Sequence, residues 1–267
     1  MSISALLIAN RGEIAIRIAR AAGDLGIRTV AVHSSDDVDN LHTRIADEAY
    51  ALAGAGAPAY LDIDGIIAAA KATGCDAIHP GYGFLAERAD FARSCAGSGL
   101  TFIGPRVADL ALFGDKAKAR AAAIAADVSV IQGLDHAVSL AEAQAFFEQL
   151  GPNGAMMIKA IHGGGGRGAR VVTTQDDVAS AYERCKSEAS AAFGREDVFV
   201  EAFIAKARHI EVQILGDQHG SIANLGEREC SVQRRFQKIV EVAPAPGLDT
   251  GLRGKIIDAA MRFAKSV

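Results

Sequence analysis

The 267-residue chain has no tryptophan, and phenylalanine and tyrosine supply only 6% of its residues. Its four cysteines, Cys75, Cys95, Cys185 and Cys230, form no CxxC pair, so we expect reduced thiols and no zinc site. No apolar run approaches the roughly 20 residues that cross a bilayer, and the N-terminal apolar run lacks the basic flank and cleavage site of a signal peptide. The sequence therefore predicts a cytoplasmic protein without a membrane segment.

Neither sign of charge dominates the sequence. Lysine and arginine number 28 against 32 aspartates and glutamates, which gives a net charge of −4. There is no basic excess that would favour nucleic acid as a partner, and no charge block typical of a disordered tail. Half of the residues are hydrophobic, and a length prior of about 150 residues per domain predicts two domains. We find no internal repeat.

Short apolar runs alternate with helical patterns over the first hundred residues. Strands are expected at 6–9, 29–33, 77–79 and 100–103, and helices from Gly12, at 66–73 and at 91–96. This alternation predicts an α/β fold with a parallel sheet and helices on both of its faces. Loops after the carboxyl ends of such strands build the ligand crevice, so we expect 10–13 and 79–83 to lie there.

The second half of the chain has a different pattern. We expect a helix at 115–126 and a small α+β unit over about 134–203. The unit contains helices at 140–150 and 176–192 and strands at 156–161, 169–173 and 198–202. Three extended runs follow near 208–215, 220–226 and 231–242, and then a helix from Leu252.

The densest motif is a glycine-rich loop. Gly163, Gly165 and Gly168 formally satisfy GxGxxG, but that dinucleotide fingerprint requires a helix after the loop, and here a strand is expected on each side. No Lys-Ser/Thr pair closes the loop, so it is not a P-loop. Glycine amides can lie directly on phosphate oxygens, and Lys159 on the incoming strand adds a positive charge. The pattern favours a phosphate flap over the alternative, an exposed hairpin loop.

Two further segments carry polar side chains on expected strands. Strict alternation at 208–214 places His209, Glu211 and Gln213 on one face, with Ile210, Val212 and Ile214 toward the core. The run 227–238 gathers charged and amide side chains that suit an anion site. The alternative for 208–214 is an ordinary half-exposed strand. The alternative for 227–238 is a salt-bridged surface strand.

Together these segments resemble biotin carboxylases, the ATP-grasp subunits or domains of acetyl-CoA, propionyl-CoA, other acyl-CoA and pyruvate carboxylases. The match runs in family order across the whole chain. The matching segments are IANRGEIAIRI (8–18), AVHSSDD (31–37), HPGYGFLAE (79–87), FIGP (102–105), GDK (114–116), IKA and GGGGRG (158–160, 163–168), RHIEVQI (208–214), GERECSVQRRFQKIVE (226–241) and APAPG (243–247).

The resemblance implies a Rossmann-like pre-ATP-grasp domain at 1–114 and an ATP-grasp domain at 115–267. The second comprises a lid at about 134–203 and an incomplete central domain. It implies a ligase that phosphorylates bicarbonate with ATP and transfers CO2 from carboxyphosphate to carrier-linked biotin. The implied cofactors are ATP, Mg²⁺ and bicarbonate. The implied partners are a biotin carboxyl carrier protein or domain, a carboxyltransferase and a second copy of the chain as a homodimer, with no nucleic acid and no membrane.

The resemblance also implies roles for individual residues. Lys238 is the expected catalytic residue, facing the γ-phosphate and bicarbonate, and Glu201 is expected at the adenine amino group. ATP phosphates are expected to contact Lys116, Lys159 and the flap residues Gly163, Gly164, Gly165, Gly166 and Gly168. His209 and Gln233 are expected around the ribose. Glu211, Arg235 and Glu241 are expected to support these groups.

The sequence departs from the family pattern in four ways. Phe236 stands where histidine is frequent, Ala202 stands where lysine is common, and 161–162 shorten the glycine run. These changes predict altered nucleotide affinity. The family also continues beyond Val267 with its magnesium-binding glutamates, its bicarbonate-binding arginine and its general base. We therefore expect no metal site within this chain, weak nucleotide binding and no turnover by the fragment alone.

Two other functions compete with this interpretation. One is another ATP-grasp ligase, such as a carbamoyl phosphate synthetase-like enzyme, which also uses lysines and a glycine-rich flap. The other is a non-catalytic nucleotide-binding or interaction module. A NAD-dependent dehydrogenase is a remote third, because the turn at 10–13 lacks GxGxxG.

Overall fold

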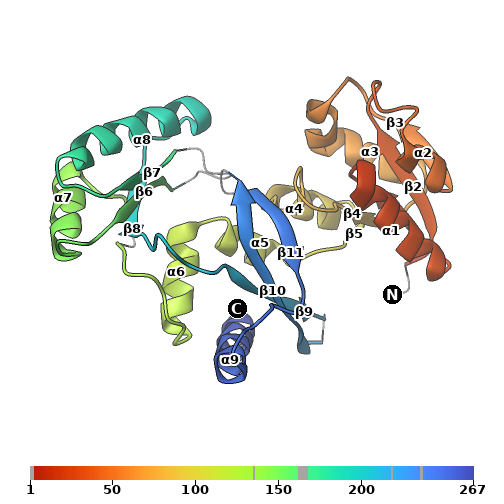
Figure 1. Cartoon of the computed structure of the whole chain (residues 1–267). Helices are drawn as coiled ribbons and strands as arrows, with labels where there is room; N and C mark the ends of the chain where they lie inside the picture. The colour runs from red at the N-terminus through yellow and green to blue at the C-terminus, as the bar shows by residue number, and fades with distance from the viewer. Residues whose placement is uncertain (1–2, 135, 162–167, 218, 235–236) are drawn as a thin grey trace. The chain divides into compact units, whose positions relative to one another are not determined.

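The computed structural model describes residues 3–134, 136–161, 168–217, 219–234 and 237–267. The chain divides into two compact units, Met1–Gly114 and Asp115–Val267. The first contains a five-stranded sheet and the second contains two three-stranded sheets (Figure 1). Within the described residues, no helix has the length and apolar character needed to cross a membrane.

A parallel sheet forms the centre of the first unit, with the strand order β3-β2-β1-β4-β5. Its strands are β1 Ala5–Ile8, β2 Arg28–His33, β3 Glu48–Ala51, β4 Ala77–His79 and β5 Thr101–Phe102. The predicted α/β fold is therefore confirmed. Four of these strands were predicted to within two residues at each end. Strand β3 was missed because it lies at the sheet edge and none of its side chains is buried, so burial leaves no alternating pattern in its four residues.

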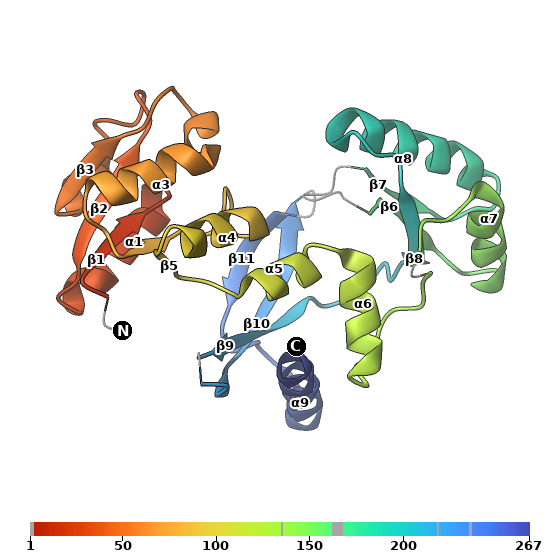
Figure 2. The same ribbon diagram turned by 180° about the vertical axis from the view of Figure 1, so that it is seen from behind.

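Helices cover both faces of this sheet (Figures 1 and 2). Leu7 faces a core that includes helices α3 and α4, whereas Leu6 and Ile8 face α1, as the two-residue period of a strand requires. The helical elements are α1 Gly12–Asp24, α2 Leu41–Ile45, the 3-10 helix Ala57–Leu61, α3 Ile63–Ala72, α4 Ala89–Gly97 and α5 Val107–Phe113. Helices α2 and α5 were not predicted, since they are short and α5 buries only Leu110.

The second unit begins with α6, Lys116–Ala125, and an antiparallel sheet of order β7-β6-β8. Its strands are β6 Met156–Ala160, β7 Ala169–Val172 and β8 Val198–Ala202, and its helices are α7 Leu140–Gln149 and α8 Asp177–Phe193. Both helices pack on the sheet face that carries Met156, Ile158 and Val200. The opposite face carries Lys159 and Glu201, which alternate with those core residues.

A second antiparallel sheet has the order β11-β10-β9, with β9 Ile210–Gly216, β10 Ile222–Arg234 and β11 Gln237–Val242, and α9 Thr250–Ser266 follows it. The predicted break between 226 and 231 was wrong. Strand β10 runs through this region, and a register irregularity near Gly226, whose φ is +89°, absorbs the local change. Ile210, Val212 and Ile214 were predicted in the core, and this prediction was wrong, since all three are only half-buried. The sheet also exposes other large apolar side chains, such as Leu225 and Ile239.

Candidate functional site

Asn10 joins the two loops that were expected at the carboxyl edge of the parallel sheet. Its Nδ2 donates to the carbonyl oxygens of Pro80 at 2.7 Å and Tyr82 at 2.9 Å. Gly81 fits between them with φ +66°, and a Cβ there would lie 2.6 Å from Asn10 Nδ2. Only glycine meets both requirements without strain. The predicted juxtaposition of 10–13 with 79–83 is confirmed.

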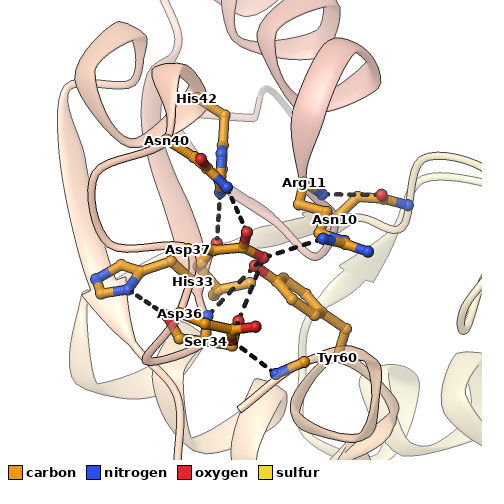
Figure 3. Close-up of polar contacts among 11 residues, drawn as sticks. Asn10, Arg11, His33, Ser34, Asp36, Asp37, Asn40, His42 and Tyr60 are labelled. Atoms are coloured by element: carbon orange, nitrogen blue, oxygen red, sulfur yellow. Dashed lines mark hydrogen bonds and ion pairs between the residues drawn. The ribbon is translucent and has the colours of Figure 1, made fainter.

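A buried carboxylate, Asp37, organises the end of strand β2 (Figure 3). The hydroxyl of Tyr60 donates to Asp37 Oδ2 at 2.7 Å and the guanidinium of Arg11 donates to the same oxygen at 3.4 Å. The amide of Asn40 donates to Oδ1, and the Ser34 hydroxyl lies 3.2 Å from Oδ2. Hydrogen bonds thus compensate the cost of burying this charge.

The same network keeps Tyr60 protonated. Burial, together with the hydrogen bond to Asp37, raises the pKa of Tyr60 to about 12. The guanidinium carbon of Arg11 lies 5.8 Å from the ring centre of Tyr60 and 5.9 Å from that of Phe84, within the range of a cation–π contact. The network was not predicted, because Tyr60 and Asp37 are 23 positions apart in the sequence. We interpret the Asp37–Tyr60 network as a structural support for the loops at the carboxyl edge of the parallel sheet.

In the second unit, two lysines lie near one carboxylate. Lys159 on β6 and Glu201 on β8 form an ion pair across the open face of the β7-β6-β8 sheet. Desolvation lowers the pKa of Lys116, at the start of α6, and the positive charge of Lys159 lowers it further, while Glu201 opposes the shift. Two lysine side chains therefore lie near one another in this region, an arrangement that suits an anionic ligand.

The flanks of the glycine loop are strands, as predicted. Strands β6 and β7 are antiparallel neighbours, with Lys159 opposite Ala169, so the dinucleotide-fingerprint alternative is excluded by the missing helix. Gly168 has φ +66°, and a Cβ there would lie 3.0 Å from the Cβ of Ala160. Gly163, Gly164, Gly165 and Gly166 lie outside the described residues, and their role as a flap stays a prediction.

The β11-β10-β9 sheet carries a separate polar cluster. The carboxylate of Glu211 accepts from Lys238 Nζ through Oε1, and His209 Nε2 lies 3.0 Å from the same oxygen. Gln233 Nε2 lies 3.0 Å from His209 Nδ1. Burial raises the pKa of Glu211, but the hydrogen bond and charge of Lys238 outweigh it, so the net shift is downward. The predicted sharing of one face by His209 and Glu211 is confirmed.

Two members of this cluster, Arg228 and Cys230, lie in the run 227–238 that was predicted to suit an anion site, but neither was given a role of its own. Arg228 Nη2 donates to Glu211 Oε2 at 3.0 Å, and its Nη1 lies 3.2 Å from Glu241 Oε2. The thiol of Cys230 lies 3.5 Å from Glu211 Oε2, and burial followed by the charge of Glu211 raises the pKa of Cys230. The alternation in 226–231 carried the signal, since residues 228 and 230 share a face of a strand. Arg235 and Phe236 lie outside the described residues.

Magnesium was expected to bind beyond Val267. Among the residues that the structure describes, no group of three or more His, Cys, Asp and Glu side chains is placed to hold a metal ion. Mg²⁺ prefers oxygen ligands in octahedral geometry. The described donor set therefore does not fit a magnesium site.

Comparison with known proteins identifies both halves of the chain. Residues 2–110 match the family described as biotin carboxylase, N-terminal domain, and residues 115–267 match the carbamoyl-phosphate synthase L chain, ATP binding domain. Pyruvate carboxylase from Staphylococcus aureus is 51% identical over 99% of this chain, and the human mitochondrial enzyme is 52% identical over the same share. The chain spans only 23% of the length of each.

Two solved structures are also similar. A biotin carboxylase in complex with β,γ-ATP from Campylobacter jejuni is 41% identical with a TM-score of 0.95, over 99% of this chain and 59% of its own. The biotin carboxylase domain of Hydrogenobacter thermophilus 2-oxoglutarate carboxylase, a dimer with MgADP, ADP and bicarbonate, is 41% identical with a TM-score of 0.93, over 99% of this chain and 58% of its own. The chain therefore belongs to the biotin carboxylase family, with a Rossmann-like N-terminal domain followed by ATP-grasp elements.

Proposed function

We propose that this chain supplies the nucleotide-binding part of a biotin carboxylase. The observation that carries the proposal is that Lys116 and Lys159 lie together beside the carboxylate of Glu201. Such a region suits the triphosphate of ATP, because charge-assisted contacts to phosphate are among the strongest hydrogen bonds in proteins. The glycine loop between β6 and β7 would close over the phosphates, and Glu201 with the backbone after it would receive the adenine.

Lys238 is proposed as the catalytic residue. A bicarbonate oxygen attacks the γ-phosphorus of ATP, the bond from that phosphorus to the β,γ-bridging oxygen breaks, and ADP leaves with the electron pair. Charge spreads over the γ-phosphoryl oxygens in the transition state, so a fixed cation beside them lowers the barrier. His209 and Gln233, which contact each other at 3.0 Å, are proposed to line the ribose. Glu211, Glu241 and Arg235 are proposed to keep the cations in place.

The second half-reaction requires partners. Carboxyphosphate releases CO2 and phosphate, biotin N1 gives its proton to the released phosphate, and the deprotonated nitrogen attacks the CO2. We propose that the substrate of this step is carrier-linked biotin and that a carboxyltransferase receives the carboxyl group. We also propose that the protein is a homodimer and acts in the cytoplasm. The matching carboxylases support the biotin-dependent reaction, and the dimeric biotin carboxylase structure supports the homodimer. Magnesium and bicarbonate are proposed because a similar structure was solved with MgADP and bicarbonate.

A second candidate is a carbamoyl phosphate synthetase-like ligase. It is favoured by one observation: the family that matches residues 115–267 carries the name of that enzyme. Both reactions begin with ATP and bicarbonate, but they differ in the acceptor, which is biotin in one and ammonia in the other. The acceptor therefore separates the two proposals.

The test measures ADP release by the protein as its host expresses it, with ATP, Mg²⁺ and bicarbonate. Biotin and ammonium chloride are added in separate reactions. We expect free biotin to increase ADP release and to become carboxylated, and ammonium to have no effect. Stimulation by ammonium alone would favour the second candidate. Nucleotide binding without ADP release under any of these conditions would favour a non-catalytic module.

A further inference from the structure

Arg228 occupies the centre of the polar cluster on the β11-β10-β9 sheet. It lies on β10, the middle strand, directly opposite Glu211 of β9 in the pairing register. One guanidinium nitrogen reaches Glu211 Oε2 at 3.0 Å and another reaches Glu241 Oε2, on β11, at 3.2 Å. The planar fork of arginine suits such a two-carboxylate contact, which a lysine cannot reproduce.

The two oxygens of Glu211 have different partners. Oε1 contacts Lys238 and His209, and Oε2 contacts Arg228 and Cys230. Arg228 thereby fixes the rotation of the carboxylate that Lys238 contacts. The side chain of Glu211 is only 22% exposed, so solvent cannot replace these contacts fully.

Among the residues that the structure describes, Arg228 balances the charge of the cluster. Two carboxylates, Glu211 and Glu241, face two permanent cations, Lys238 and Arg228. Without the guanidinium, the two carboxylates of this described set would face the ammonium of Lys238 alone. Negative charge that grows beside Lys238 in a transition state would then meet a net negative cluster, which raises the barrier.

We propose that Arg228 is a positioning residue for phosphoryl transfer: it neutralises Glu241 and orients Glu211, which leaves the charge of Lys238 available to the reacting phosphate. This inference rests on the proposed function. It differs from a purely structural role, in which Arg228 would only fasten three strands together. The two roles make opposite predictions for a variant that removes both Arg228 and the charge of Glu241.

The experiment compares Arg228→Met, Glu241→Gln and the double variant in the protein as its host expresses it. We expect Arg228→Met to lower kcat for bicarbonate-dependent ATP cleavage about tenfold or more, while the Kd for ATP changes less than about threefold. Adding Glu241→Gln restores the charge balance, and kcat should return to within about threefold of wild type. Arg228→Lys, which keeps the charge but loses the fork, should lie between the two.

Arg208→Met is the matched control. Arg208 forms an ion pair with Glu229 of β10, at 2.5 Å, and it has no contact with Glu211 or Lys238 among the described residues. It should leave kcat within about twofold of wild type, because the change removes a cation that lies outside the contacts of Glu211, Glu241 and Lys238. If Glu241→Gln fails to restore kcat in the Arg228→Met background, or if Arg208→Met lowers kcat equally, the inference is overturned while the proposed function stands. A wild-type protein without ATP cleavage would overturn both.

Discussion

The two lysines at the start of helix α6 provide a matched test of phosphate binding. Lys116 shares its surroundings with Lys159 and Glu201, whereas Lys118 is 70% exposed and pairs only with Asp115 among the described residues. Changing either to methionine removes one positive charge from the same helix. A hydrogen bond to a charged group contributes about 1.5–3 kcal/mol, so Lys116→Met should weaken ATP binding by about 10–100-fold. Lys118→Met should change it less than about threefold.

Isothermal titration with a non-hydrolysable ATP analogue measures both dissociation constants, and its pH dependence adds a second check. The pKa of Lys116 is lowered by desolvation and by Lys159, so this side chain loses its proton below the ordinary lysine value. Above that lowered pKa, ATP binding must take up a proton, so affinity should fall with rising pH before other lysines titrate. Equal effects of Lys116→Met and Lys118→Met, or a pH dependence that survives in Lys116→Met, would refute the placement of Lys116 at the phosphates.

Three further substitutions test other parts of the account. Asp37→Asn should lower the free energy of unfolding of the first unit by about 1.5–3 kcal/mol, because it removes a buried charge that accepts several hydrogen bonds, while exposed Asp39→Asn should change it by less than about 0.5 kcal/mol. Hydrogen exchange of strands β1 and β2 measures both effects, and equal values would contradict the role of Asp37 in supporting the loops. Gly168→Ala places a Cβ at a positive φ and against Ala160. The KM for ATP should therefore rise several-fold if the β6-β7 hairpin positions the glycine loop, and an unchanged KM would show that the hairpin does not position it. Lys238→Gln should lower kcat for ATP-dependent carboxylation about 100-fold or more with little change in the Kd for ATP; parallel losses of both would make Lys238 a binding residue.

Much of the fold could be predicted because its signals are local. Strands β4 and β8 were predicted at their observed limits, since short apolar runs between turn residues have few alternative structures. Strand β3 and helix α2 escaped prediction because most of their side chains remain exposed, so no periodicity marks them. Their position depends on pairing with β2 and on contacts with α1, which a sequence pattern does not encode.

The candidate site was predicted in part. The alternation at 208–214 was enough to place His209 beside Glu211, because a strand repeats every two residues. The pairing of Lys159 with Glu201 joins residues 42 positions apart, and only the resemblance to a family suggested that both belong to one site. Arg228 contacts Glu241 across a strand pair with irregular register. Counting residues along β10 and β11 therefore could not have found this contact.

The central claim is that Lys116, Lys159 and the adjoining loop neutralise the triphosphate of ATP. It is tested most directly by titrating the protein as its host expresses it with ATP, ADP and AMP in the presence of Mg²⁺. The account predicts saturable binding that weakens at least several-fold with each phosphate removed, since each removes charge-assisted contacts. Equal affinity for ATP and AMP, or no binding of any of the three, would contradict it.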